Sequence, residues 1–130
     1  GILIALSAGA FLSTKASARD TKRKADLEEI RSALEIYRTD CGKYPTTVAF
    51  GSALTGDGSS SSCGTANIYM AKVPNDPQTS AYQYGYALSG TGYKLCSYIE
   101  TSTSCTADDG SCSDCPSCGP SGCRYKVKNP

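Results

Sequence analysis

Residues 18–47 read ARDTKRKADLEEIRSALEIYRTDCGKYPTT. This segment predicts the main helix of the chain, on which the rest of the architecture depends. No Gly or Pro interrupts residues 16–40, and apolar side chains recur there at steps of three and four, the spacing that aligns one helical face. We expect this face to pack against the rest of the protein. Its members are Leu27, Ile30, Leu34 and Tyr37, and Cys41 continues it. Gly42 can end the helix in the left-handed conformation, and Pro45 prevents its continuation.

Charged side chains fill the other faces of this helix. Four pairs of opposite sign lie four residues apart, namely Asp20 with Lys24, Lys22 with Asp26, Lys24 with Glu28, and Arg31 with Glu35. Such pairs stabilise exposed helices, so we predict that these faces are solvated or pair with neighbouring copies. The basic cluster Lys22, Arg23 and Lys24 could instead meet anionic lipid or DNA, but its acidic neighbours favour charge pairing.

An apolar segment precedes the charged one. Residues 1–12 read GILIALSAGAFL and carry no charged side chain. As a helix they would rise about 18 Å, whereas the hydrocarbon layer of a bilayer is about 30 Å thick. They also lack the basic start and cleavage site of a secretory signal. We interpret them as the later part of a longer apolar helix, continuous with the charged segment unless Gly9 breaks it.

The sequence therefore predicts two parts. Residues 1–42 would form one assembly helix of about 40 residues, apolar over residues 1–14 and amphipathic over residues 15–42. A helix of this length cannot bury its whole surface in so small a chain, so its apolar end needs lipid or other copies of itself. Residues 43–130 would form a globular head.

Within the head, residues 51–68 begin with a Gly- and Ser-rich run that indicates a surface loop. Residues 81–100 alternate Tyr and other apolar side chains around SGTG, which indicates an antiparallel hairpin. A third strand is expected near CRYKVK at residues 123–128. The fold class is α+β, a long N-terminal helix packed by a small antiparallel sheet, with a disulfide-rich C-terminal region at residues 101–130.

The chain contains eight cysteines, Cys41, Cys63, Cys96, Cys105, Cys112, Cys115, Cys118 and Cys123. This even number suits four disulfides in an oxidising compartment, although the sequence does not determine their pairing. The one pair we suggest joins Cys41 at the helix end to Cys63. The spacing of the last four resembles that of zinc or iron–sulfur ligands, so a metal-binding or redox module is an alternative. Disulfides are favoured because residues 101–123 contain few apolar side chains to bury.

The composition argues against several other functions. The 13 basic and 12 acidic residues nearly balance, so nucleic acid is not expected as the primary ligand. The chain has no His, and neither a nucleophile with its base nor a pair of catalytic acids can be assembled from it. We therefore expect neither an enzyme nor a protein with a metal or cofactor. The nine tyrosines are explained by strand formation rather than by electron conduction.

Residues 18–47 resemble the helix–head junction of type IV pilins and of the major pseudopilins of type II secretion. Residues 69–100, YMAKVPNDPQTSAYQYGYALSGTGYKLCSYIE, are similar to that family's stretch of Pro and Asp-Pro before a Tyr-rich hairpin. The opening GILIALSAG is similar to the later part of the family's assembly helix. The resemblance implies that this chain starts some way after the family's processed end, so the cleavage site, methylated first residue and nearby acidic residue cannot be assigned.

The resemblance implies a structural subunit of an extracellular cell-surface filament. Its partners would be many copies of itself, the inner membrane before assembly, and a pilus or secretion assembly machinery. The side chains expected to supply the contacts between copies are Ile2, Leu3, Ile4, Leu6, Phe11 and Leu12. A surface pilus is the first hypothesis and a type II secretion pseudopilus the second.

Many secretion pseudopilins carry a calcium loop after the hairpin, and this sequence does not clearly match it. Asp108, Asp109 and Asp114 could supply oxygen ligands. A solvated acidic turn explains these three residues equally well. This difference from the family weakens the secretion hypothesis relative to the surface pilus.

Overall fold

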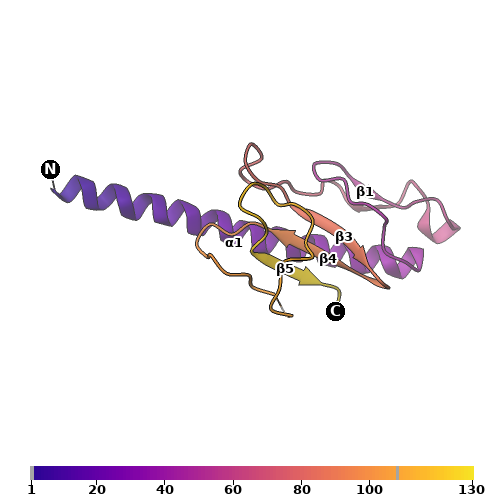
Figure 1. The fold of residues 1–130 in the computed structure, drawn as a ribbon. Helices are drawn as coiled ribbons and strands as arrows, with labels where there is room; N and C mark the ends of the chain where they lie inside the picture. Colours follow the sequence, from indigo (N-terminus) through magenta and orange to yellow (C-terminus); the bar gives the residue numbers. More distant parts are fainter. Residues whose placement is uncertain (1, 108) are drawn as a thin grey trace.

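A single long helix dominates the fold. The structure, a computed structural model, describes residues 2–107 and 109–130, and side chains from residue 9 onward within those ranges. Helix α1 spans Ile2–Cys41 and continues through Gly9 without a break. At its end Gly42 adopts a φ of 72°, and its N–H donates to the carbonyl of Arg38 at 2.8 Å. Only the C-terminal half of α1 lies along the head, and the N-terminal half projects from it (Figure 1).

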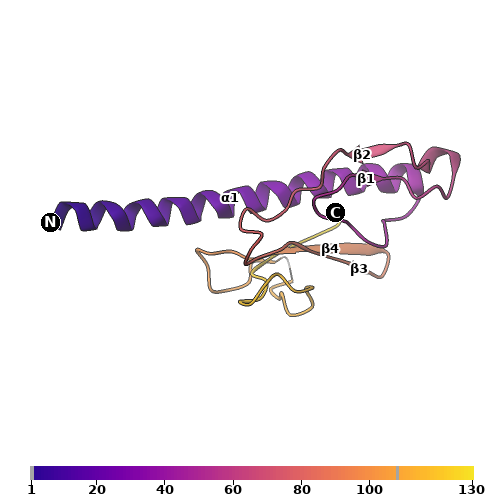
Figure 2. The same ribbon diagram turned by 90° about the horizontal axis from the view of Figure 1, so that it is seen from above.

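The head contains a three-stranded antiparallel sheet that lies beside α1. Strands β3 (Gly85–Ser89) and β4 (Gly92–Ser97) form the predicted hairpin, and β5 (Tyr125–Lys128) pairs with the other edge of β4. Figure 2 shows this sheet and α1 as two layers. The prediction of an α+β fold is confirmed. The hairpin is shorter than expected. It begins at Gly85, so Tyr82 and Tyr84 lie before β3.

A second, smaller sheet occupies part of the segment that was predicted as a loop. Strand β1 (Leu54–Thr55) pairs antiparallel with β2 (Ile68–Met70), and a short 3-10 helix, η1 (Ser61–Cys63), lies between them. Leu54 is buried in the main core and Cys63 is bonded to Cys41. These two anchors hold the polar residues of the segment in place, which is why it is more ordered than its composition suggests.

The apolar face of α1 forms the centre of the main core. Its four large members, Leu27, Ile30, Leu34 and Tyr37, are at most 1% exposed. They pack with residues from both sheets and the connecting segments, among them Leu54, Val73, Tyr93 and Leu95. Burial of each large apolar side chain is worth about 1.5–3 kcal/mol, so this face accounts for much of the attachment between helix and head.

Both faces of β4 are covered. Tyr93 and Leu95 belong to the core beside α1, whereas Cys96 on the opposite face belongs to a second buried cluster with Tyr98 and Cys118. Successive side chains of a strand point to opposite faces, so the C-terminal region must cover the face of β4 that is turned away from α1. The central strand is therefore enclosed between the helix and a loop-rich layer.

Four disulfides cross-link the head. Cys41–Cys63 joins the end of α1 to η1, and Cys96–Cys115 joins β4 to the C-terminal region. Two further bridges, Cys105–Cys112 and Cys118–Cys123, close short loops within that region. In the part of the chain that the structure describes, no helix has the combination of length and apolar character needed to cross a membrane.

Candidate assembly surface and helix–head junction

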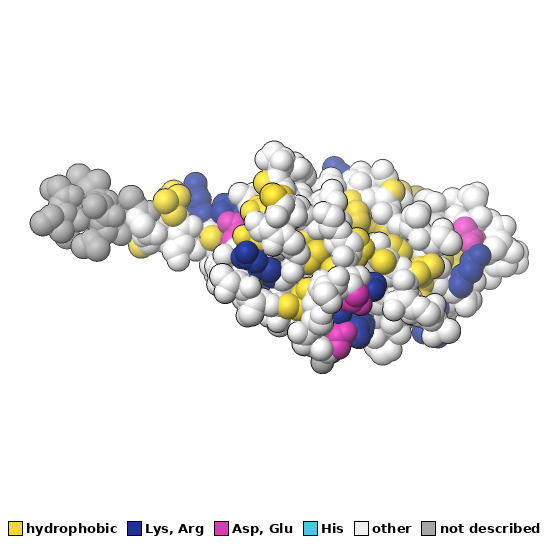
Figure 3. Space-filling view, viewed as in Figure 1, with side chains coloured by type: hydrophobic (Ala, Val, Ile, Leu, Met, Phe, Trp, Pro, Cys, Tyr) yellow, Lys and Arg dark blue, Asp and Glu magenta, His cyan; other side chains and the backbone are white. Residues whose placement is uncertain are grey.

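The projecting half of α1 carries the residues expected to contact other copies. The side chains of Ile2, Leu3, Ile4 and Leu6 lie outside the described residues. Phe11 and Leu12 are 59% and 66% exposed, and the ammonium group of Lys15 lies 4.5 Å from the centre of the Phe11 ring. Figure 3 shows hydrophobic and basic side chains next to each other on this part of the helix. Two adjacent exposed apolar side chains away from any core are a candidate contact surface.

Arg23 occupies the place where α1 enters the head. Its side chain is fully buried, and its Nε and Nη2 atoms donate to the two carboxylate oxygens of Asp76 at 2.7 and 3.0 Å. Nη1 donates to Asp20 at 2.8 Å and to Glu100 at 2.7 Å, and Nη2 also donates to the side-chain oxygen of Gln78 at 3.2 Å. This one cation therefore joins the helix to two separate segments of the head.

Asp20 makes the reciprocal connection from helix to head. Its carboxylate accepts from the backbone N–H groups of Glu100 and Thr101, both at 2.9 Å, and from the Thr101 hydroxyl at 2.8 Å. Burial alone would raise the pKa of Asp20, but these hydrogen bonds outweigh it and the pKa is lowered. Arg19 forms a bidentate pair with Glu100, both contacts at 2.6 Å, which lowers the pKa of Glu100. We call Arg19, Asp20, Arg23, Asp76 and Glu100 the helix–head junction.

Aromatic rings close one side of the junction. Tyr82 and Tyr98 are stacked with ring centres 4.0 Å apart. The Arg23 guanidinium lies 5.6 Å from the centre of the Tyr82 ring and 5.8 Å from that of Tyr98, and Arg124 lies 4.6 Å from the latter. A cation near an aromatic face is stabilised electrostatically, more so where water is excluded. The rings thus compensate part of the cost of burying Arg23.

The prediction that the charged faces of α1 are solvated is wrong for three residues. Asp20, Arg23 and Asp26 are at most 4% exposed. Asp26 accepts a hydrogen bond from the Tyr84 hydroxyl at 2.7 Å and pairs with Lys22 at 2.9 Å. The head supplies partners from distant segments, and these partners make burial of the charges possible.

The expected pairs within the helix are correspondingly few. Among the described residues, Lys22 with Asp26 is the single pair of the four expected that is formed. Arg31 instead contacts Glu28 at 3.4 Å. The carboxylate of Glu35 accepts hydrogen bonds from the hydroxyl groups of Tyr44 at 2.9 Å and Tyr93 at 3.2 Å. Glu35 therefore takes tertiary partners in place of Arg31, whereas Arg31 takes a different partner on the same helix.

The acidic residues of the C-terminal region are neutralised by lysines. The Lys126 ammonium group donates to Asp109 at 2.8 Å and to Asp114 at 2.9 Å, and this side chain is 1% exposed. Lys128 contacts Asp109 at 2.6 Å, and Lys94 contacts Asp114 at 2.8 Å. These hydrogen bonds lower the pKa of both carboxyl groups. Asp108, the third suggested calcium ligand, lies outside the described residues.

This arrangement does not fit a calcium site. Calcium needs six to eight oxygen ligands around it, whereas the two carboxylates converge on the ammonium group of Lys126. A cation is thus already supplied by the chain at the point where a metal ion would have to lie. We assign the acidic residues to a structural ion cluster with three lysines, Lys94, Lys126 and Lys128.

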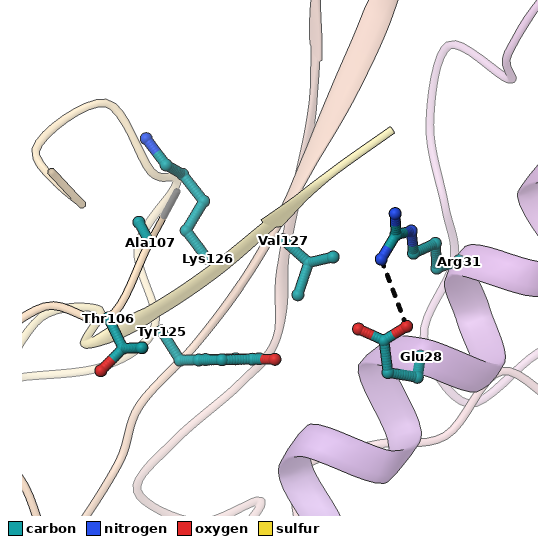
Figure 4. A pocket seen from close by; sticks show the side chains of 7 residues that line it. All are labelled: Glu28, Arg31, Thr106, Ala107, Tyr125, Lys126 and Val127. Atoms are coloured by element: carbon teal, nitrogen blue, oxygen red, sulfur yellow. Dashed lines mark hydrogen bonds and ion pairs between the residues drawn. The ribbon is translucent and has the colours of Figure 1, made fainter. Parts of the chain in front are cut away.

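An open groove of about 270 Å³ lies between α1 and β5. Figure 4 shows the ion pair of Glu28 and Arg31 on its helical wall, with the Val127 side chain extending towards the helix. Lys126 extends to the other side of β5 (Figure 4). The described residues that line the groove include no nucleophile paired with a base, and we assign no catalytic role to the groove.

All eight cysteines are paired in the four disulfides of the structure. Thiolates are the form in which cysteine binds metal. The Cys-rich segment that suggested a metal-binding or redox module therefore has no thiolate to offer a metal in this oxidised state. Its sulfur atoms nevertheless lie close together, and the Sγ atoms of Cys96, Cys115 and Cys123 are within 4.8 Å of one another.

Comparison with known proteins gives a family match over most of the chain. The family model described as type II secretion system (T2SS), protein G matches residues 10–111. These residues include most of α1, the smaller sheet and the β3–β4 hairpin. No curated protein and no solved structure matches the chain.

Replacement of Arg23 by Met is expected to lower the free energy of unfolding by about 3–5 kcal/mol, because the buried carboxylates of Asp20 and Asp76 and the partly buried one of Glu100 lose their shared cation. Urea unfolding with the disulfides intact measures the loss. Arg31→Met is the matched control, since its pair with Glu28 is partly exposed, and it should change the value by no more than about 0.5 kcal/mol. Equal losses in the two variants would contradict the importance of the junction.

The junction should also make the head sensitive to acid. The pKa values of Asp20 and Glu100 lie below their ordinary values of 3.8 and 4.5 in the folded protein. The unfolded chain therefore binds protons first as the pH falls, so stability is complete above about pH 4.5 and declines progressively below it. Urea midpoints measured between about pH 6 and pH 2.5 should show this decline. Glu100→Gln should flatten it, whereas Glu29→Gln, at an exposed position, should leave it unchanged.

Lys126→Met should lower Tm by a few degrees, because Asp109 and Asp114 would lose the ammonium group that they share and would keep only Lys128 and Lys94. Millimolar calcium should restore part of this loss, since the position between the two carboxylates would then be open to a hard cation. The unmodified protein should show the same Tm with calcium and with a chelator. Lys72→Met, at an exposed position, is the control. A Tm of the unmodified protein that falls on chelation would refute the lysine assignment.

Proposed function

Because the chain belongs to the type II secretion system protein G family, we propose that it is a structural subunit that assembles with many copies of itself into a secretion pseudopilus. The observation that carries this proposal is the half of α1 that projects beyond the head with Phe11 and Leu12 exposed (Figure 1). The family match favours the pseudopilus over the surface pilus that the sequence analysis placed first.

Assembly would proceed by packing of projecting helices from different copies. Apolar side chains three and four residues apart form ridges that fit the grooves of a neighbouring helix. Each large side chain fully buried in this way contributes about 1.5–3 kcal/mol. The residues proposed for these contacts remain Ile2, Leu3, Ile4, Leu6, Phe11 and Leu12. The heads, which lie along the C-terminal half of α1, would face outward.

The helix–head junction would give such a filament its regularity. A helical polymer repeats one contact geometry in every copy, so the head must keep a fixed orientation relative to the helix. An apolar face alone constrains rotation and sliding weakly, whereas the charge-assisted hydrogen bonds of Arg23 have fixed directions. We therefore assign the junction the role of holding the head in one position during assembly.

The proposal places the subunit outside the cytoplasm after assembly and in the inner membrane before it, with the secretion assembly machinery as its partner. Four disulfides are consistent with an oxidising compartment.

Phe11→Asp and Leu6→Asp should each abolish filaments, because a charge buried between helices would weaken the addition of every subunit by at least about tenfold. Electron microscopy of filaments from cells that express the secretion machinery measures the effect. Circular dichroism melting of the full chain in detergent should show an unchanged head. Ile36→Asp is the control, because it alters an exposed apolar side chain on the same helix beside the head. Normal filaments from the Phe11 variant would contradict the proposed surface.

The same variants distinguish the two filament types. For a pseudopilus, loss of assembly should stop export of the proteins that the secretion system carries. For a surface pilus, export should continue while long fibres disappear from the cell surface. The second outcome would overturn the pseudopilus and leave the filament subunit itself supported.

A further inference from the structure

Two of the disulfides lie against each other. Cys96–Cys115 joins β4 to the C-terminal region, and Cys118–Cys123 closes a short loop beside it. The Sγ atom of Cys123 lies within 4.8 Å of both sulfur atoms of the first bridge. A sulfur held this close to a disulfide needs only a small displacement to react with it, because exchange proceeds by direct attack of a thiolate on a disulfide sulfur.

The surroundings keep these four sulfurs together. Cys96 and Cys118 are fully buried in one cluster with Tyr98, and Cys115 and Cys123 pack against that cluster while remaining partly exposed. Each bridge thus joins one partly exposed residue to one fully buried residue, and a reagent in solution would approach it from the partly exposed side. No such grouping of a bridge with a third sulfur is found for Cys41–Cys63 or Cys105–Cys112 among the described residues.

We propose that Cys96, Cys115, Cys118 and Cys123 form a thiol–disulfide exchange site that a monothiol can open. The two bridges re-pair at this site as Cys96–Cys123 and Cys115–Cys118. The second of these new bridges spans the sequence Cys-Pro-Ser-Cys at residues 115–118, a Cys-X-X-Cys spacing that is common among redox-active cysteine pairs.

The exchange balances in three steps. The thiolate of the monothiol attacks Sγ of the partly exposed Cys115, forms a mixed disulfide there, and releases Cys96 as a thiolate. Cys96 attacks Sγ of its neighbour Cys123, forms the Cys96–Cys123 bond, and releases Cys118 as a thiolate. Cys118 then attacks Sγ of Cys115 in the mixed disulfide, forms the Cys115–Cys118 bond, and releases the monothiol as a thiolate. Nothing is oxidised or reduced overall.

Re-pairing changes how the C-terminal region is attached to the sheet. In the structure β4 is anchored to residue 115, and after exchange it is anchored to Cys123, close to the start of β5. The packing of the loop resists this change. A Cβ atom on Gly85 would lie 3.2 Å from Pro116, and one on Gly119 would lie 2.6 Å from the carbonyl of Ala81. These close approaches favour the observed pairing, so the re-paired form is expected as a minor population beside it.

The test uses a variant in which one exchanging sulfur is left as a thiol. In Cys118→Ser the thiol of Cys123 remains beside the Cys96–Cys115 bridge. Alkylation of the folded chain followed by peptide mass spectrometry should place at least roughly one tenth of the label on Cys96 or Cys115 instead of Cys123. In the matched control Cys112→Ser the free thiol is on Cys105, and all of the alkylation label of that variant should be found on Cys105. Label confined to Cys123 in the first variant would overturn the proposal.

A second measurement uses the unmodified chain, so the test does not depend on the folding of a variant. The oxidised protein is incubated with reduced glutathione, quenched by alkylation, and mapped for linked peptides. Cys96–Cys123 and Cys115–Cys118 should appear at least about tenfold faster than any new bridge of Cys41 or Cys63. Equal rates for all bridges would indicate general unfolding and refute a localised site, as would persistence of the original four pairs alone.

Discussion

The guanidinium of Arg23, buried between α1 and the head, is the contact on which the geometry of the molecule depends. It lies at the last turn of the helix before the projecting half begins, and three carboxylates and two aromatic rings surround it. A buried charge is tolerated only when its partners are correctly placed. The apolar core below provides most of the attachment energy, and the directional hydrogen bonds of the junction would set the register and orientation in which the helix is attached.

This division of roles suits a subunit that acts through its helix. The described side chains of the projecting half of α1 pack on no core of this chain, and the exposed Phe11 and Leu12 would gain stability by the proposed contact with other copies. The helix–head junction would keep the head from rotating freely about α1, so the packing of the helices would also set the positions of their heads. A filament of the proposed kind requires both properties in one chain, a contact surface and a rigid joint beside it.

The C-terminal region is stabilised by different means. Few of its side chains are apolar, yet it covers the outer face of β4 and encloses Cys96 and Tyr98. Disulfides and the lysine–carboxylate cluster around Lys126 replace the hydrophobic contacts that the region lacks. Because two of its bridges share one buried cluster, the covalent framework of this layer can be rearranged locally, unlike the bridge between Cys41 and Cys63.

The sequence by itself determined the long helix, its apolar face at Leu27, Ile30, Leu34 and Tyr37, the hairpin, the third strand and the family, since these depend on local periodicity and on motifs within short segments. It did not reveal the junction, although Arg23 and Asp20 continue the same spacing of four and three residues from Leu27 towards the N-terminus. A charged side chain at such a position is predicted to be solvent-exposed unless its partner can be identified. The partners Asp76 and Glu100 are 53 and 77 residues away from Arg23 in the sequence. The pairing of the last six cysteines was likewise decided only by the tertiary structure, because spacing along a loop does not fix distances between sulfur atoms in space.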